Sequence, residues 1–151
     1  MATAGIYSAK NTTCTFGGVP ALGLASDNAY TLSYKEDGYT ITEGLDGFIT
    51  ASQTSTEVME VTIRLMHTSS YNNVLQAFYT SQRVNPITAF RSFFFKDLLG
   101  TLSVTSDQSL IIKPADIVTS KDVPEREWKI AVMNPIVVGG GSIASPFVLP
   151  I

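Results

Sequence analysis

Apolar and polar side chains alternate most regularly over residues 57–65. One set consists of Met59, Val61, Ile63 and Leu65, and the alternate set consists of Val58, Glu60, Thr62 and Arg64. A period of two predicts a β-strand with one face against the core and the other against polar surroundings. Shorter alternations over residues 30–35 and 39–42 predict two further strands of the same kind.

Short segments rich in Thr, Val, Ile and aromatic residues make up most of the remaining chain, separated by Gly, Pro, Asn and Asp. The sequence Gly-Leu-Asp-Gly at residues 44–47 predicts a turn, after which residues 48–54 return as the second strand of a hairpin. Further strands are predicted over residues 89–96, 101–104, 108–113 and 127–134. This rhythm is typical of a mainly β protein, an antiparallel β-sandwich or barrel.

One segment changes to a helical period. Its apolar residues are Tyr71, Val74, Leu75, Phe78 and Tyr79, and its polar residues Asn72, Asn73, Gln76 and Thr80 are expected on the other side. Ser69 or Ser70 is a suitable N-cap, and Asn85-Pro86 marks the end. We therefore predict one helix over residues 70–82 that closes an open side of the β core.

Composition bounds the kind of surface that the folded chain presents. The chain has 151 residues, enough for one domain, and only 15% of them are charged, against a usual share of about 25%. Such neutral surface is often covered by neighbouring subunits. A net charge of −3 argues against binding nucleic acid through its phosphates, although nucleic acid could still pass nearby. We see no signal peptide or membrane span, and expect a protein made in a cytoplasm.

The residues that carry out chemistry are scarce. His67 is the single histidine and Cys14 the single cysteine, so we expect a structural histidine, a buried thiol and no disulfide. Glu43 and Asp46 flank the predicted turn and are expected to form it rather than to act as a catalytic pair. The glycines at residues 139–141 lack the lysine and helix of a phosphate-binding loop. We therefore predict no enzyme, no metal site and no cofactor.

A family resemblance rests on the order of several segments. Residues 65–79 read as a strand end, the pattern Leu-x-x-Thr-Ser, and a helix with Asn, Leu and Tyr. The supporting segments are Tyr-Thr-Ile-Thr at 39–42, Gly-Leu-Asp-Gly at 44–47, Glu-Val-Thr-Ile-Arg-Leu at 60–65, Ile-Lys-Pro-Ala-Asp at 112–116 and Glu-Trp-Lys-Ile-Ala at 127–131. In order and spacing, residues 30–137 resemble the tail tube proteins of contractile-tailed bacteriophages.

The resemblance implies a structural protein with a β-sandwich or barrel and a flanking helix. Its subunits would assemble as hexameric rings stacked into a tube, and each would lend strands to a continuous inner β-barrel. The lumen would conduct DNA during ejection without binding it specifically. The implied partners are the chain itself and the tail sheath, tape-measure, baseplate and tail terminator proteins. The implied location is the tail of the virion, after assembly in the cytoplasm of the host bacterium.

Under this resemblance the hairpin of residues 40–54 and the strand of residues 57–65 form the wall of the lumen. The helix lies outside that wall, facing the next subunit or the sheath. The lumen-lining candidates are Thr40, Thr42, Thr50, Ser52, Glu60, Thr62 and Arg64. Arg64 would need neutralisation by a nearby carboxylate such as Glu60, because a basic wall would retain DNA. Ordinary solvent exposure on one face of an antiparallel sheet explains the same polar residues equally well.

The last stretch of the chain departs from the resemblance. We expect residues 1–138 to form the tail tube domain and residues 139–151 to form a C-terminal extension, a glycine hinge followed by an apolar arm. A free tail is normally polar, so the arm is expected to dock on a neighbouring subunit. Its inter-subunit candidates are Ile143, Phe147, Val148, Leu149 and Ile151.

Two other functions fit the same residues. One is the inner-tube protein of a related contractile injection or secretion system, which has the same architecture and a protein cargo. The other is a monomeric β-sandwich binding module whose loops hold a ligand. Size-exclusion chromatography separates the module from the tube, because only the tube protein forms rings or longer assemblies.

Overall fold

The computed structural model describes residues 12–25, 28–97 and 101–139. The elements in this part of the chain are β1 (Thr12–Phe16), β2 (Val19–Pro20), β3 (Tyr30–Tyr34), β4 (Tyr39–Glu43), β5 (Ile49–Gln53), β6 (Val58–Met66), α1 (Tyr71–Val84), a 3-10 helix (Pro86–Thr88), β7 (Arg91–Asp97), β8 (Ser103–Lys113), β9 (Glu125–Met133) and β10 (Ile136–Val138). The strands of this part pair antiparallel throughout. The predicted mainly β class with one α-helix is confirmed.

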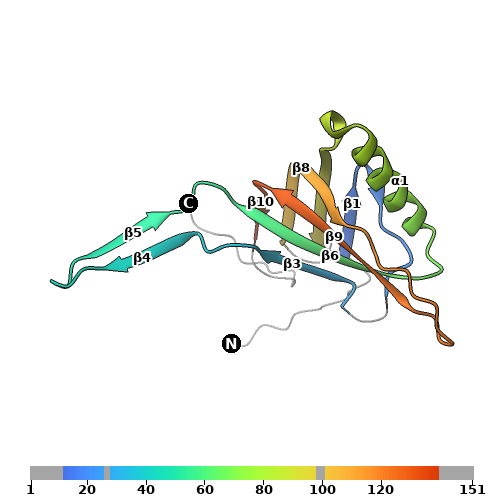
Figure 1. Cartoon of the computed structure of the whole chain (residues 1–151), viewed down its shortest axis with the longest axis horizontal. Coiled ribbons are helices and arrows are strands. Elements are labelled where there is room, and N and C mark those ends of the chain that lie inside the picture. The colour runs from blue at the N-terminus through green and yellow to red at the C-terminus, as the bar shows by residue number, and fades with distance from the viewer. Residues whose placement is uncertain (1–11, 26–27, 98–100, 140–151) are drawn as a thin grey trace.

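Eight of these strands form one sheet in the order β2-β1-β7-β8-β9-β6-β3, and β10 also pairs with β8. The sheet curves around its core, which brings together strands that are far apart in the strand order. Tyr30 of β3 packs edge-to-face on Phe95 of β7, with ring centroids 5.5 Å apart. β4 and β5 form a separate two-stranded sheet that projects from the body of the molecule (Figure 1). The chain is thus a folded body with one long hairpin attached.

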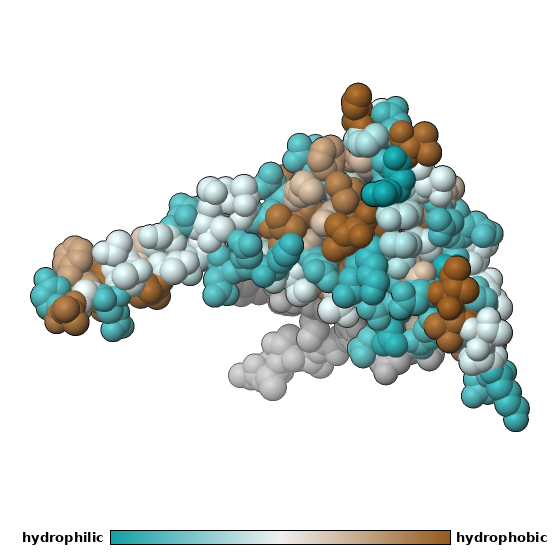
Figure 2. Space-filling view, in the orientation of Figure 1, coloured by the Kyte–Doolittle hydropathy of each residue, from teal (hydrophilic) through white to brown (hydrophobic). Residues whose placement is uncertain are grey.

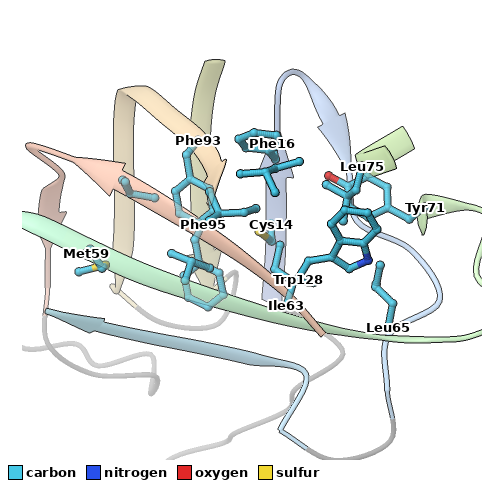
Figure 3. Close-up of a cluster of buried hydrophobic side chains, with 14 of the residues drawn as sticks. Cys14, Phe16, Met59, Ile63, Leu65, Tyr71, Leu75, Phe93, Phe95 and Trp128 are labelled. Carbon is cyan, nitrogen blue, oxygen red and sulfur yellow. The ribbon is translucent and has the colours of Figure 1, made fainter. Parts of the chain in front are cut away.

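The core lies between the curved sheet and α1. The four apolar residues predicted to face inward from β6 are all buried, as their alternation requires. From the helix, Tyr71 and Leu75 are buried in the same cluster as Trp128 of β9 (Figure 3), and Phe78 packs edge-to-face on Phe16 of β1. The prediction that the helix closes one side of the β core is confirmed.

Asn72 was expected on the polar side of the helix, and that prediction is wrong. The structure buries Asn72, which is 4% exposed. Its Nδ2 donates to the carbonyls of Met66 and Ser69 at 3.0 and 3.1 Å, and its Oδ1 accepts a bond from Trp128 Nε1 at 3.0 Å. The connection from β6 to α1 and the buried indole both need hydrogen-bond partners, and one amide side chain supplies them.

Replacing Asn72 by alanine is expected to destabilise the subunit. The buried Trp128 Nε1 would lose its acceptor, and such an unsatisfied group costs roughly 1–3 kcal/mol. Asn73 is the matched control, because it is the adjacent residue of the same helix and its side chain is exposed. Urea unfolding followed by circular dichroism should show a lower midpoint for Asn72→Ala alone. Equal midpoints for the two variants would contradict the assigned role.

Sequence reasoning divided β8 into two strands, whereas the structure has one. The register between β7 and β8 shifts between Arg91/Ser109 and Phe93/Ser106, so one extra residue bulges out of β8. Ser106 stabilises the bulge, because its hydroxyl donates to Met133 O at 2.6 Å and accepts from Gln108 N at 3.1 Å. Residues 105–107, which separate the two predicted strands, therefore belong to one bulged strand.

Candidate functional site

The hairpin of β4 and β5 brings the four predicted threonine and serine candidates together. Thr40 lies opposite Ser52, and Thr42 lies opposite Thr50. Side chains of cross-strand partners point to the same side of an antiparallel pair, so these four hydroxyls share one face. The structure does not place a lumen, but it assembles the hydroxyl face that the alternation predicted.

The opposite face of the hairpin is mainly apolar, with Glu43 and Gln53 as its polar residues, and sequence reasoning did not single it out. Tyr39, Ile41, Ile49 and Ala51 lie on it, since they alternate with the hydroxyl residues. Ile41 is 67% exposed and Ile49 is 62% exposed. Figure 2 shows hydrophobic residues toward the outer end of the projecting hairpin, next to hydrophilic ones. The sequence contains the signal for this apolar face, because the apolar residues occupy the odd-numbered positions that alternate with the hydroxyl residues.

The turn at the tip of the hairpin accounts for the residues that flank it. Gly44 N donates to Phe48 O at 2.7 Å, and Phe48 N donates to Asp46 Oδ1 at 3.1 Å. Gly47 adopts a φ of 86°, a conformation that favours glycine. Asp46 is therefore a turn-forming residue, as predicted.

The three candidates from β6 lie on the face of the sheet that points away from the core. Glu60, Thr62 and Arg64 are half-buried and alternate with the buried residues of the strand. β9 runs beside them, with Lys129 opposite Thr62 and Glu127 opposite Arg64. The polar side of β6 is thus continuous with the polar side of β9.

Arg64 is paired with a nearby carboxylate, as expected, but the carboxylate belongs to Glu125 and not to Glu60, the residue offered as an example. Arg64 pairs with Glu125 of β9 at 2.5 Å, and Glu60 pairs with Lys129 of β9 at 3.6 Å. Residues four apart in a strand are about 13 Å apart, too far for contact, whereas residues diagonally opposite on neighbouring strands are within reach of long side chains. Each β6 charge is therefore paired across strands.

The two groups that might have carried chemistry have ordinary surroundings. Cys14 is buried, and burial raises the pKa of its thiol to about 12, so it is protonated and unreactive at neutral pH. His67 is exposed in the connection from β6 to α1, and its backbone N–H donates to Pro124 O at 3.0 Å. Among the described residues, no cluster of His, Cys, Asp and Glu is arranged to hold a metal ion.

Within residues 12–25, 28–97 and 101–139, no helix is long and apolar enough to cross a membrane. The five inter-subunit candidates of the C-terminal arm, Ile143, Phe147, Val148, Leu149 and Ile151, lie outside the described residues.

Comparison with known proteins decides the family. The family model of the bacteriophage PhiTE tail tube protein matches residues 1–132. The chain belongs to this family. The resemblance found in the segments above is thereby confirmed, and the chain is a tail tube protein, a structural protein of the phage tail. No curated protein matches the chain by sequence.

Solved structures share the fold at low sequence identity. The tube-terminating cap of the anti-feeding prophage superposes with a TM-score of 0.63 at 8% identity, over 91% of this chain and 93% of that one. A chain of the sheath–tube complex of the extracellular contractile injection system PVC gives 0.59 at 9% identity, over 87% and 90%. A chain of the native gene transfer agent virion gives 0.62 at 9% identity, over 93% and 100%. These likenesses establish the fold of this tail tube protein.

Proposed function

We propose that this tail tube protein assembles as hexameric rings that stack into a tube whose lumen conducts DNA during ejection. The observation that carries the proposal is the hairpin of β4 and β5. Every residue of both strands is exposed, and the two strands form a sheet of their own. An isolated two-stranded hairpin is marginally stable in water at best. The hairpin therefore requires a partner, and family membership makes other copies of the chain the natural one.

Pooling strands between copies meets two requirements of the hairpin at once. Unpaired strand edges gain backbone partners, and a closed ring of strands leaves no edge exposed. The apolar face with Ile41 and Ile49 is covered by the body of a neighbouring subunit. The hydroxyl face with Thr40, Thr42, Thr50 and Ser52 then lines the lumen, joined by Glu60, Thr62 and Arg64 of β6.

The charge of the hairpin region supports a wall along which duplex DNA slides. Residues 35–57 carry five carboxylates and a single lysine. DNA carries about one negative charge per 1.7 Å of helix axis, so an acidic, hydroxyl-lined wall does not retain it. The threonine and serine side chains exchange hydrogen bonds with water and add no opposite charge.

The outer side of α1 fits a role in contacts outside the lumen wall, with the next subunit or with the sheath. A shallow groove of about 690 Å³ runs along it, and its lining is uncharged. The lining residues are Asn73, Gln76, Ala77, Thr80, Ser81, Val84, Asn85 and Thr88. We further propose that the tape-measure, baseplate and terminator proteins are partners of the assembled tube in the virion, and that assembly takes place in the host cytoplasm.

The apolar arm is proposed as a second subunit contact. Ile143, Phe147, Val148, Leu149 and Ile151 are its docking residues, and residues 1–138 are the tube domain from which it extends. The family match ends at residue 132, so the arm is a feature that the family model does not include.

An inner tube of an injection system is the second candidate. The fold is shared with chains of an extracellular contractile injection system and of the anti-feeding prophage cap. Both candidates predict the same tube, and they differ in cargo. A particle that delivers protein in place of a genome would favour the injection system.

The proposed function predicts hollow tubes with an inward-facing hairpin. Negative-stain micrographs of the purified protein should show rings or tubes with sixfold end views. In assembled tubes, a cysteine introduced at Thr50 should react with a small maleimide and resist a maleimide coupled to a bulky protein. The same cysteine should react with both reagents in the unassembled chain, where residue 50 is exposed, and the buried native Cys14 should stay silent.

Two results would overturn the proposal in different ways. A stable monomer by size-exclusion chromatography under all assembly conditions would favour a binding module. Tubes in which Thr50→Cys reacts with the bulky reagent as readily as the unassembled variant does would place the hydroxyl face outside.

A further inference from the structure

The outer face of β6 and β9 carries cations as well as carboxylates. Arg64 lies against Glu125, with a nitrogen–oxygen distance of 2.5 Å, and Lys129 lies against Glu60 at 3.6 Å. All four side chains are about one-third exposed, which leaves them in contact with solvent. Each pair joins two strands that are neighbours in the sheet.

These pairs contribute little to folding. Ion pairs with this degree of exposure are screened by water and salt, and their effect on stability is small. Each carboxylate nevertheless lies on the cation that a phosphate would otherwise contact. The ion pairs therefore matter more for preventing phosphate contacts with these cations than for the stability of the fold.

We infer that Glu60 and Glu125 mask Lys129 and Arg64, so that these two cations do not hold duplex DNA by its phosphates. The inference rests on the proposed function, in which this face belongs to the lumen wall. It assigns Glu60 and Glu125 as positioning residues that determine how weakly the wall interacts with its cargo. Arg64 and Lys129 remain half-buried members of the sheet surface, held by their partners.

The physical basis is the competition between a fixed carboxylate and a phosphate for the same cation. A free lysine or arginine that contacts a phosphate releases counterions from DNA, and the affinity gained falls steeply as salt rises. A cation already paired with a carboxylate offers a phosphate no net charge. In a ring, each unmasked cation is repeated once per subunit, so weak contacts add along the DNA.

The test removes the masking carboxylates without changing side-chain size. Full-length Glu60→Gln/Glu125→Gln, kept below its assembly concentration, is titrated against a short fluorescent DNA duplex at several salt concentrations. We expect binding at least roughly tenfold tighter than that of the parent chain at low salt, and loss of this gain at high salt. Adding Arg64→Gln and Lys129→Gln should abolish the gain.

The matched control is Glu36→Gln/Glu57→Gln. It changes the net charge by the same amount, at two residues outside the ion pairs of Arg64 and Lys129. The masking inference expects this control to bind DNA like the parent chain. Equal gains in both double variants would show an effect of net charge alone and overturn it, as would no gain in either.

Assembled tubes separate this inference from the proposed function. Unassembled Glu60→Gln/Glu125→Gln that binds DNA, together with variant tubes that release DNA at the parent rate, would support the masking but place the face outside the lumen. Variant chains that do not bind DNA, together with Thr50→Cys labelled only from within the tube, would overturn the masking and leave the proposed function standing.

Discussion

Replacing Ile41 by aspartate is expected to abolish tube formation and to leave the body of the subunit folded. Ile41 is 67% exposed in the single chain, in a hairpin that forms its own sheet, so the substitution removes no core contact. In the proposed tube the same side chain is buried against a neighbour. Burial of one isoleucine is worth about 1.5–3 kcal/mol, and a buried aspartate without a partner costs more still. Electron microscopy measures the assembly, and the thermal unfolding midpoint measures the fold.

Thr42→Asp is the matched control. Thr42 belongs to the same strand, is also β-branched, and lies on the opposite face of the hairpin. The two substitutions add the same charge and remove a similar β-propensity, so they differ only in the face they alter. We expect Thr42→Asp to assemble, because a negative charge on the lumen wall faces water. Normal tubes from Ile41→Asp, or an equal loss of assembly in both variants, would contradict the assignment of the two faces.

The sequence predicted the strands whose signal is local. β6 alternates over nine residues, and this alternation by itself specifies which side faces the core. The two hairpin strands alternate over five residues each, which predicts the strands although both of their faces are exposed. β1 and β2 were missed because Gly17, Gly18 and Pro20 obscure the pattern. β1 is stabilised by pairing with β7, far along the chain. β10 was missed for the same reason, since its three residues precede a glycine run and are stabilised by β8.

In the candidate site, too, the features that depend on local sequence were predictable and those that depend on distant strands were not. Thr40, Thr42, Thr50 and Ser52 share one face of the hairpin, because a hairpin register follows from its turn, and their place in a lumen stays a prediction. The ion pairs of Arg64 and Glu60 were not predictable, since they depend on β9 lying beside β6, and the two strands are far apart in the sequence. Asn72 was misplaced because helical spacing does not reveal which amide will meet a buried indole.

The start of the C-terminal arm is fixed by backbone geometry. Gly139 follows β10, has a φ of 76°, and has no room for a side chain because the carbonyl of Thr101 lies against it. A residue with a side chain would be strained there. The backbone at Gly139, the last described residue, is therefore held closely against Thr101.

Truncation after residue 141 is expected to leave a folded subunit that forms isolated rings or short tubes. The last strand, β10, ends at Val138, so the described core is retained. Each large apolar side chain of the arm gains about 1.5–3 kcal/mol on burial. Ordering an extended segment costs roughly 1–2 kcal/mol per residue. Docking is therefore favourable only if most of the large apolar side chains of the arm are buried. Phe147→Ser/Leu149→Ser is the matched control that keeps chain length; it should shorten tubes as truncation does. Tubes of full length from both variants would refute docking of the arm, whereas a lower unfolding midpoint of the unassembled variants would show that the arm packs on its own subunit.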